Sequence, residues 1–171
     1  MTMKCTSGQL SLRPIKLEDT ADLCDILLDD TVKQTYMVPD LTKEAAQKMA
    51  ERIAGLSNAD DRYVRGIYRN NALIGLINDV EIMDATIELG WVVAPAHQNK
   101  GYATQAVRFA INELFARGFR EVFAGAFPQN AASMRVMEKA GMERIEKAEQ
   151  IEYRGQTYNC IFYARRNYDL S

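Results

Sequence analysis

The segment from residue 85 to residue 127 constrains the fold more than any other part of the chain. A strand is predicted at 85–93, a helix is predicted over 101–116, and a short apolar strand follows at 121–127. The apolar stripe of the helix consists of Ala103, Ala106, Val107, Ala110 and Leu114. Two strands joined through a helix lie parallel with a right-handed crossover. This unit therefore predicts the parallel part of an α/β sheet.

The flanking segments predict further strands and helices. Strands are expected at residues 10–15, 63–69, 72–82, 142–153 and 156–165. Helices are expected at residues 18–28, 42–55 and 131–139. Short turns between successive strands favour antiparallel pairing. The chain therefore predicts a mixed sheet in an α/β sandwich, and residues 1–171 are expected to form a single domain.

Charge and cysteine content narrow the function classes. The formal net charge of −2 argues against general electrostatic binding to nucleic acid or to anionic membranes. No apolar run approaches the ~20 residues that span a bilayer, and residues 1–10 lack the apolar core of a signal peptide. Scattered Cys5, Cys24 and Cys160 are expected to be free thiols in a reducing compartment, the cytoplasm. A single histidine and unclustered cysteines predict no metal site.

The loop between the strand at 85–93 and the next helix has the features of an anion site. Its sequence is Gln98-Asn99-Lys100-Gly101-Tyr102-Ala103. The first N–H groups of a helix have no intrahelical partner, small residues leave them uncovered, and the helix dipole adds positive potential. The loop lacks the Walker pattern and the dinucleotide pattern Gly-x-Gly-x-x-Gly. Spacing alone leaves two interpretations open, a pyrophosphate site and a turn that binds nothing.

Four segments, at residues 88–93, 98–103, 130–142 and 158–164, together resemble the GNAT (Gcn5-related N-acetyltransferase) superfamily. Residues 98–103 look like its coenzyme A signature, Gln-x-x-Gly-x-Ala. Residues 130–142 resemble its later motif, Asn-x-x-Ser followed by an apolar pair, Glu-Lys-x-Gly and a large apolar residue. Residues 88–93 (Glu-Leu-Gly-Trp-Val-Val) and 158–164 are similar to strands of the ribosomal-protein N-terminal acetyltransferase (Rim-type) branch. The pieces follow the family order over almost the whole chain.

The resemblance implies a more detailed fold. In the family, an α+β domain holds a mixed, mostly antiparallel sheet of about seven strands with helices on both faces. The segments 85–93 and 121–127 correspond to its fourth and fifth strands, a parallel pair that splays apart at a bulge. Gly90 is the residue expected to mark this bulge.

The resemblance also implies a site for acetyl-CoA. Backbone groups of Val92 and Val93 would pair with the pantetheine arm as an added strand does; the alternative is that both are plain core residues. The residues expected to bind the pyrophosphate are Gln98, Asn99, Lys100, Gly101, Tyr102 and Ala103. Lys100 has the alternative of a solvated charge. Asn130 would hydrogen-bond the pantetheine arm, although the same side chain is suited to cap a helix.

Acetyl transfer requires a base for the amine, a stabilised oxyanion and a proton for the leaving thiolate. Glu88 is the candidate base, through a water; its alternative is a cross-strand surface partner. Many family members supply the proton from a tyrosine seven positions after the asparagine, where this chain has Met137. Ser133 is the candidate donor that the resemblance to the Rim-type pattern implies, with Tyr102 and Tyr153 as the other candidates; the alternative for Ser133 is an ordinary helix serine. Direct attack by the amine is expected, because no cysteine has a histidine near it in sequence.

The function expected from the resemblance is acetyl transfer from acetyl-CoA to a primary amine, with a protein N-terminal α-amine as the leading acceptor. A small-molecule amine, such as an antibiotic or a polyamine, is the alternative acceptor. Two other functions stay open: a catalytically silent coenzyme-binding module, supported by Met137, and a nucleotide or nucleic-acid binder.

The acceptor groove is expected between residues 29–41, the strand at 85–93 and the final hairpin. Three carboxylates of the 29–41 loop could attract a cationic acceptor, with solvated loop charges as the alternative: Asp29, Asp30 and Asp40. An exposed final strand would make a homodimer possible.

Overall fold

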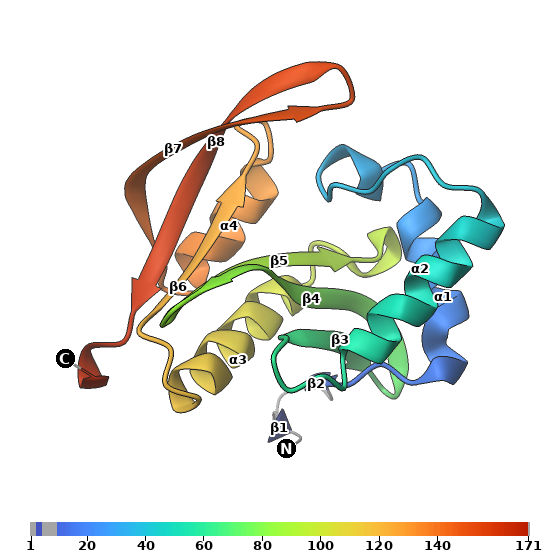
Figure 1. Cartoon of the computed structure of the whole chain (residues 1–171), viewed down its shortest axis with the longest axis horizontal. Coiled ribbons are helices and arrows are strands. Elements are labelled where there is room, and N and C mark those ends of the chain that lie inside the picture. The colour runs from blue at the N-terminus through green and yellow to red at the C-terminus, as the bar shows by residue number, and fades with distance from the viewer. Residues whose placement is uncertain (1–2, 5–9, 171) are drawn as a thin grey trace.

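The computed structural model describes residues 3–4 and 10–170, so the expectation for Cys5 lies outside the described residues. Within these ranges, eight strands form one mixed sheet in the order β1-β2-β3-β4-β5-β6-β8-β7 (Figure 1). The strands are β1 (Met3–Lys4), β2 (Leu10–Arg13), β3 (Val64–Arg69), β4 (Ala72–Met83), β5 (Thr86–Val93), β6 (Glu121–Ala126), β7 (Glu143–Tyr153) and β8 (Gln156–Arg166). The α-helices are α1 (Thr20–Leu28), α2 (Lys43–Leu56), α3 (Tyr102–Ala116) and α4 (Ala131–Lys139). The predicted mixed, mostly antiparallel α/β fold is confirmed, with β1 added to the expected strands.

Strands β5 and β6 form the predicted parallel pair, but only over a short stretch. Their pairing runs from Thr86 opposite Glu121 to Glu88 opposite Phe123. Beyond Glu88, β6 continues in register with β8, while β5 stays with β4. Figure 1 shows the two strands diverging from this point as a V. The sheet therefore opens in its middle, with the unpaired edge of β5 on one side of the opening.

Helices cover both faces of the sheet. The predicted stripe of α3 packs on one face: Ala106, Val107, Ala110 and Leu114 are fully buried in a core that also contains Ile67, Ile77, Ile87 and Met137. Helices α1 and α2 pack on the other face, where they bury Leu23, Leu27, Ala46 and Ala50 against Tyr68, Leu76 and Val92. No helix of residues 10–170 is long and apolar enough to cross a bilayer.

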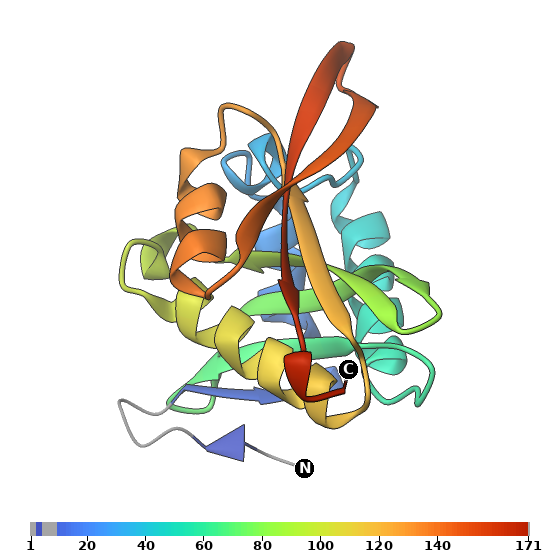
Figure 2. The ribbon, with the colours of Figure 1, turned by 90° about the vertical axis from the view of Figure 1, so that its left-hand side faces the viewer.

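The β7–β8 hairpin extends beyond the rest of the sheet, as Figure 2 shows. Its own small core includes Phe123, Phe127, Cys160 and Phe162. Because β8 returns to pair with β6, the final strand lies inside the sheet and β7 forms its edge. The expectation of an exposed final strand is therefore wrong, and it no longer supports a homodimer.

The bulge expected at Gly90 lies instead across the ladder, in β4. Asp79 pairs with Leu89 and Glu81 pairs with Glu88, so Val80 is the extra residue. Gly90 keeps a regular pairing with Asn78. A Cβ on Gly90 would lie 3.2 Å from Val80 Cγ2, so this glycine makes room for the bulged valine of the neighbouring strand.

Candidate active site

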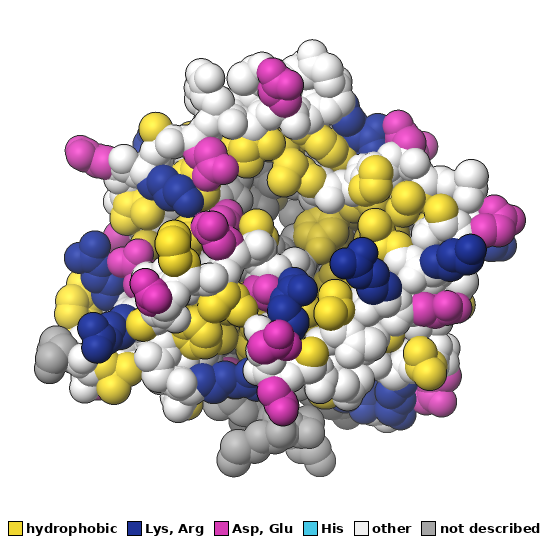
Figure 3. All heavy atoms as spheres, viewed as in Figure 1, with side chains coloured by type: hydrophobic (Ala, Val, Ile, Leu, Met, Phe, Trp, Pro, Cys, Tyr) yellow, Lys and Arg dark blue, Asp and Glu magenta, His cyan; other side chains and the backbone are white. Residues whose placement is uncertain are grey.

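Two cavities meet where β5 and β6 separate. The helix-start cavity, of about 390 Å³, is lined by the end of β5, the loop before α3 and one side of α4. The hairpin cavity, of about 470 Å³, is lined by parts of the 29–41 loop, β4, β5 and β6 and by the β7–β8 hairpin. Figure 3 shows the surface hollowed beneath this hairpin. Four residues line both cavities: Thr35, Trp91, Asn130 and Ser133.

The loop before α3 presents its backbone to the helix-start cavity. Asn99 and Gly101 have left-handed φ angles of 60° and 80°, and α3 begins directly afterwards with Tyr102. No described side chain caps this helix start, so its first N–H groups stay available to an anion. Tyr102 and Ala103 also line the cavity.

Two side chains of the same loop are used within the protein. Gln98 Nε2 donates to the Val93 carbonyl oxygen at 2.9 Å, which ties the loop to the end of β5. Lys100 Nζ donates to the Ala96 carbonyl oxygen at 3.0 Å. Gln98 lines the cavity and Lys100 does not, so the structure does not bring the lysine into the candidate site.

The end of β5 contributes its main chain. The side chain of Val93 is buried in the α3 core and that of Val92 in the α1–α2 core. Both residues nevertheless line the helix-start cavity, and β6 does not pair with this part of the strand. The side chains of both valines are therefore core side chains, as the alternative interpretation expected, while the backbone edge of this part of β5 faces open space.

Asn130 and Ser133 form one hydrogen-bonded unit at the start of α4. Asn130 Oδ1 accepts from the Ser133 N–H at 3.1 Å, and Asn130 Nδ2 donates to Ser133 Oγ at 2.9 Å. Asn130 therefore caps the helix. The Ser133 hydroxyl accepts one hydrogen bond and keeps its own proton for another partner.

Met137 does not reach either cavity. Its side chain is fully buried in the core beneath α3, and it is absent from the lining of both cavities. The residue seven positions after Asn130 is thus a packing residue in this chain, and any proton for the leaving thiolate must come from elsewhere.

Glu88 lies at the point where the parallel pairing ends and lines the hairpin cavity. Burial raises the pKa of its carboxyl above the ordinary value, and the neighbouring carboxylates Glu149 and Glu81 raise it further. Lys147 acts in the opposite direction and lowers the Glu88 pKa. A half-buried carboxyl with a raised pKa in a cavity is a candidate proton acceptor.

The three loop carboxylates expected in the acceptor groove are engaged elsewhere. Asp29 Oδ1 accepts from the Thr31 and Val32 N–H groups, Asp30 pairs with Lys33, and Asp40 pairs with Arg154 at 3.0 Å. None of the three lines the hairpin cavity, so the structure does not bring them to the candidate acceptor site. The carboxylates that do line it are Asp79, Glu88 and Glu149, and Asp79 is neutralised by Arg62 at 2.8 Å.

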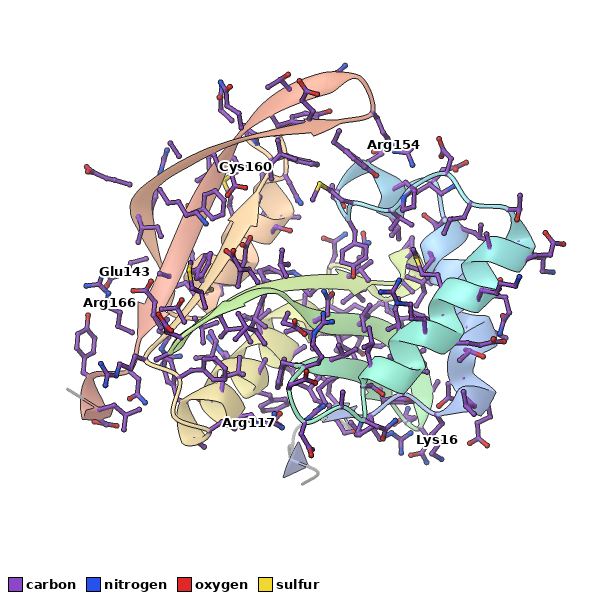
Figure 4. The ribbon with its side chains drawn as sticks, viewed as in Figure 1. Lys16, Arg117, Glu143, Arg154, Cys160 and Arg166 are labelled. Carbon is purple, nitrogen blue, oxygen red and sulfur yellow. The ribbon has the colours of Figure 1, made fainter. Side chains whose placement is uncertain are left out.

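The tip of the β7–β8 hairpin fastens the 29–41 loop over the hairpin cavity. The Tyr153 hydroxyl donates to the Lys33 carbonyl oxygen at 2.6 Å and accepts from the Val38 N–H at 3.3 Å. Arg154, at the hairpin tip in Figure 4, donates to the Val38 carbonyl oxygen at 3.0 Å and pairs with Asp40. We call these contacts the clasp.

Several residues that line the cavities were not predicted from the sequence. Trp91 lines both cavities, although in the sequence it served only as part of a strand motif. Arg135 and Lys139 line the helix-start cavity from α4. Because they are four residues apart, they lie on one helix face. This spacing in the sequence could have indicated their place in the site. Glu149 gave no local signal, because its place opposite Cys160 depends on the β7–β8 register.

Comparison with known proteins agrees with this geometry. Residues 9–143 match the family model described as the acetyltransferase (GNAT) domain. The chain is 32% identical to the uncharacterized N-acetyltransferase YnaD of Bacillus subtilis over 148 residues, which are 83% of this chain and 84% of that protein. It is also 30% identical, over 109 residues covering 60% of each chain, to the probable N-acetyltransferase YjcK of the same organism.

Two solved structures are similar over nearly their whole length. An acetyltransferase (GNAT family) from Bacillus anthracis has 25% identity and a TM-score of 0.83, with 97% of this chain and 98% of that chain covered. RimL, a ribosomal L7/L12 alpha-N-protein acetyltransferase in complex with coenzyme A, has 18% identity, a TM-score of 0.85 and complete coverage of both chains. The RimL likeness concerns the fold alone. The family match over residues 9–143 shows that this chain belongs to the GNAT acetyltransferases and is an acyltransferase enzyme.

Proposed function

We propose that this enzyme moves an acetyl group from acetyl-CoA directly to a primary amine, and that the amine is a protein N-terminal α-amine. The observation that carries the proposal is the junction of the two cavities at Asn130 and Ser133, with Glu88 in the hairpin cavity. A donor in one cavity and an acceptor in the other would meet beside a hydroxyl and a carboxylate. The free thiols of Cys24 and Cys160 fit a reducing compartment, and we propose the cytoplasm.

The residues of the helix-start cavity fit coenzyme A. The uncapped N–H groups at the start of α3 suit the pyrophosphate, and Arg135 and Lys139 add positive charge on the facing helix. The unpaired edge of β5 up to Val93 offers backbone donors and acceptors to the amides of the pantetheine arm. This assignment gives the phosphate-binding role mainly to the backbone of residues 98–103, with Gln98 holding the loop in place.

The residues of the two cavities can supply every proton transfer that the reaction needs. Glu88, through a water, takes the proton of the acceptor ammonium, and the freed lone pair forms a C–N bond with the thioester carbonyl carbon. The C–S bond breaks as the Ser133 hydroxyl gives its proton to the leaving sulfur, and the second proton of the attacking nitrogen passes to the Ser133 oxygen, so that the products are the amide, the coenzyme A thiol and an intact serine. Asn130 holds that hydroxyl in place through Nδ2.

The basicity of the acceptor favours an α-amine. An α-ammonium has a pKa near ~8, and a lysine or aliphatic ammonium has a pKa near ~10.4. Taking the proton from the second costs about 3 kcal/mol more at the same base. A carboxylate is a weak base, even with the raised pKa of Glu88, so the less basic amine is the better partner. The similarity in fold to RimL, whose name gives an alpha-N-protein acceptor, agrees with this choice.

The test is thiol release from acetyl-CoA over a panel of acceptors. Peptides with a free N-terminus should be turned over, and mass spectrometry should place the acetyl group on the α-nitrogen. The same peptides with a blocked N-terminus and an internal lysine should not react. Turnover with polyamines or aminoglycosides and none with peptides would replace the acceptor, and tight coenzyme binding with no turnover at all would favour the silent module.

A further inference from the structure

Another irregularity of the sheet lies in β7, and Lys147 lies within it. Ile145 pairs with Phe162 and Glu149 pairs with Cys160, so residues 146–148 oppose a single residue of β8. Such an excess breaks the ladder and bends the strand. Lys147 lies inside this interruption, on the strand that also carries Glu149 into the hairpin cavity.

The ammonium of Lys147 is held by two aromatic rings and one carboxylate, which together we call its seat. Lys147 Nζ lies 4.5 Å from the ring centroids of both Phe123 and Phe162 and 3.5 Å from Glu149 Oε2. Two aromatic faces and one carboxylate hold a cation well. The side chain is 34% exposed, so its charge is only partly screened by water.

This seat adjoins Glu88. Phe123 is the β6 residue opposite Glu88 in the parallel pair, and residues opposite each other project on the same face of a sheet. The cation over the Phe123 ring is therefore a neighbour of the Glu88 carboxyl. Phe162 and Glu149 line the hairpin cavity together with Glu88, so two of the three partners of Lys147 border the proposed acceptor site.

Of the other ionisable groups around Glu88, two carboxylates disfavour its ionised form, and the remaining groups are neutral or already paired. Glu81 is its partner on β4, Glu149 approaches from β7, and both raise the Glu88 pKa, as burial does. Cys160 on β8 is a neutral thiol whose pKa is raised by burial. Asp79 on β4 is paired with Arg62. Lys147 alone among the groups that shift the Glu88 pKa lowers it.

We propose that Lys147 is a positioning residue of the acceptor site, whose ammonium, seated on Phe123 and Phe162, keeps Glu88 ionised and able to take the acceptor's proton. The part of this inference that concerns catalysis rests on the proposed role of Glu88. The part that concerns ionisation stands on the geometry of the cluster. The two parts can be tested separately.

The ionisation test is a carbon-detected NMR titration of the Glu88 side-chain carboxyl in the full chain. In Lys147→Met, which keeps the length of the apolar stem and removes the charge, the Glu88 midpoint should move to higher pH. In Lys147→Arg, which keeps the charge and stacks on rings, it should stay near the wild-type value. Lys147→Gln provides a second neutral variant if the Met variant folds poorly.

Lys16→Met is the matched control, because it removes one lysine charge that also sits beside a glutamate, Glu18 at 3.2 Å. Lys16 lies at the edge of the molecule opposite Arg154 (Figure 4). Its loss should leave the Glu88 midpoint unchanged. An unmoved midpoint in a folded Lys147→Met or Lys147→Gln, or an equal movement in Lys16→Met, would overturn the inference.

The catalytic test is the pH profile of kcat/KM with an N-terminal peptide. In Lys147→Met, the acid limb of the kcat/KM profile should move to higher pH, so that kcat/KM on this limb falls about 3- to 10-fold and recovers as the pH rises and Glu88 ionises. Lys147→Arg should follow the wild-type profile. A shifted NMR midpoint with an unshifted rate profile would leave the role of Lys147 in ionisation intact and would instead remove Glu88 as the base.

Discussion

Glu88 has a carboxyl in a half-buried position, where burial opposes the charge that a base must carry. We predict that Glu88→Gln lowers kcat/KM about 10²-fold or more, because an amide cannot accept the proton. The change should appear in kcat for N-terminal peptides, while the affinity for acetyl-CoA stays within about twofold, because Glu88 does not line the helix-start cavity. Activity within threefold of the wild type would remove Glu88 from the reaction.

The same substitution should affect stability in the opposite direction. Because the folded-state pKa of Glu88 is raised, its contribution to stability is full below the unfolded pKa of ~4.3 and is lost as the pH rises through the folded pKa. Glutamine has no such loss. We predict a higher Tm for Glu88→Gln than for the wild type at pH 7, with a difference that shrinks toward pH 4. A lower Tm at pH 7 would contradict the burial of an ionised carboxylate.

Ser133 offers a second test at the level of one side chain. Ser133→Ala keeps the N–H that Asn130 Oδ1 accepts and removes only the hydroxyl. We predict that kcat falls about 10²-fold, the low end of the range for a lost general acid, while the Tm changes little. Ser133→Thr, which retains a hydroxyl, should keep more activity than the alanine variant. Equal rates in the two variants would exclude the hydroxyl as the donor.

Helix α3 has a left-handed glycine at each end, which allows a matched pair of variants. Gly101 precedes it with φ +80° and Gly118 follows it with φ +97°, and an added Cβ meets nothing within 4 Å at either position. Glutamate at either position should therefore cost a similar 1–2 kcal/mol, roughly, of backbone strain. Only Gly101 lines the helix-start cavity. We predict that Gly101→Glu abolishes acetyl-CoA binding in calorimetry, whereas Gly118→Glu retains it.

The clasp joins two elements that are far apart in sequence. Tyr153→Phe removes the hydroxyl that bonds the Lys33 carbonyl oxygen and the Val38 N–H. The loss should cost about 1–3 kcal/mol, because both loop groups are left without this partner. We predict faster hydrogen exchange of the amides in residues 29–41 and unchanged exchange in α3. Tyr158→Phe, which removes a hydroxyl from the same hairpin, should leave the loop unchanged, because among the described residues that hydroxyl donates to Gln156 Oε1, within the hairpin itself.

Local sequence patterns predicted the helices and strands well. The predictions that failed depend on contacts between segments that are distant in the sequence. The stripe of α3 and the parallel β5–β6 pair followed from periodicity within a continuous segment. The Gly90 bulge was misplaced because it depends on the register with β4. Asp40 was misplaced because its partner, Arg154, lies 114 residues away. The same limit applies to Lys147, whose seat is formed by residues of two other strands.

At the scale of the whole molecule, the candidate site lies between separately packed parts. The hairpin core, the α3 core and the α1–α2 core are distinct clusters, and the two cavities lie where they meet. The helix-start cavity takes residues from the 29–41 loop, from β5 and from α4. A ligand held there touches segments of the first, middle and last thirds of the chain, so its binding energy should oppose unfolding of the whole fold.

Thermal denaturation with ligands therefore tests the coenzyme assignment on the whole molecule. Acetyl-CoA at a hundredfold excess over its Kd adds about 2.7 kcal/mol to the free energy of unfolding, which for a chain of 171 residues corresponds to a Tm increase of about 5–10 °C. ATP shares the pyrophosphate but lacks the pantetheine arm that the open edge of β5 would bind, so it should give a much smaller increase, and RNA should give none. The increase with acetyl-CoA should disappear in Gly101→Glu and persist in Gly118→Glu. Stabilisation by ATP alone would mean that the cavity binds nucleotides and would contradict its assignment to acetyl-CoA.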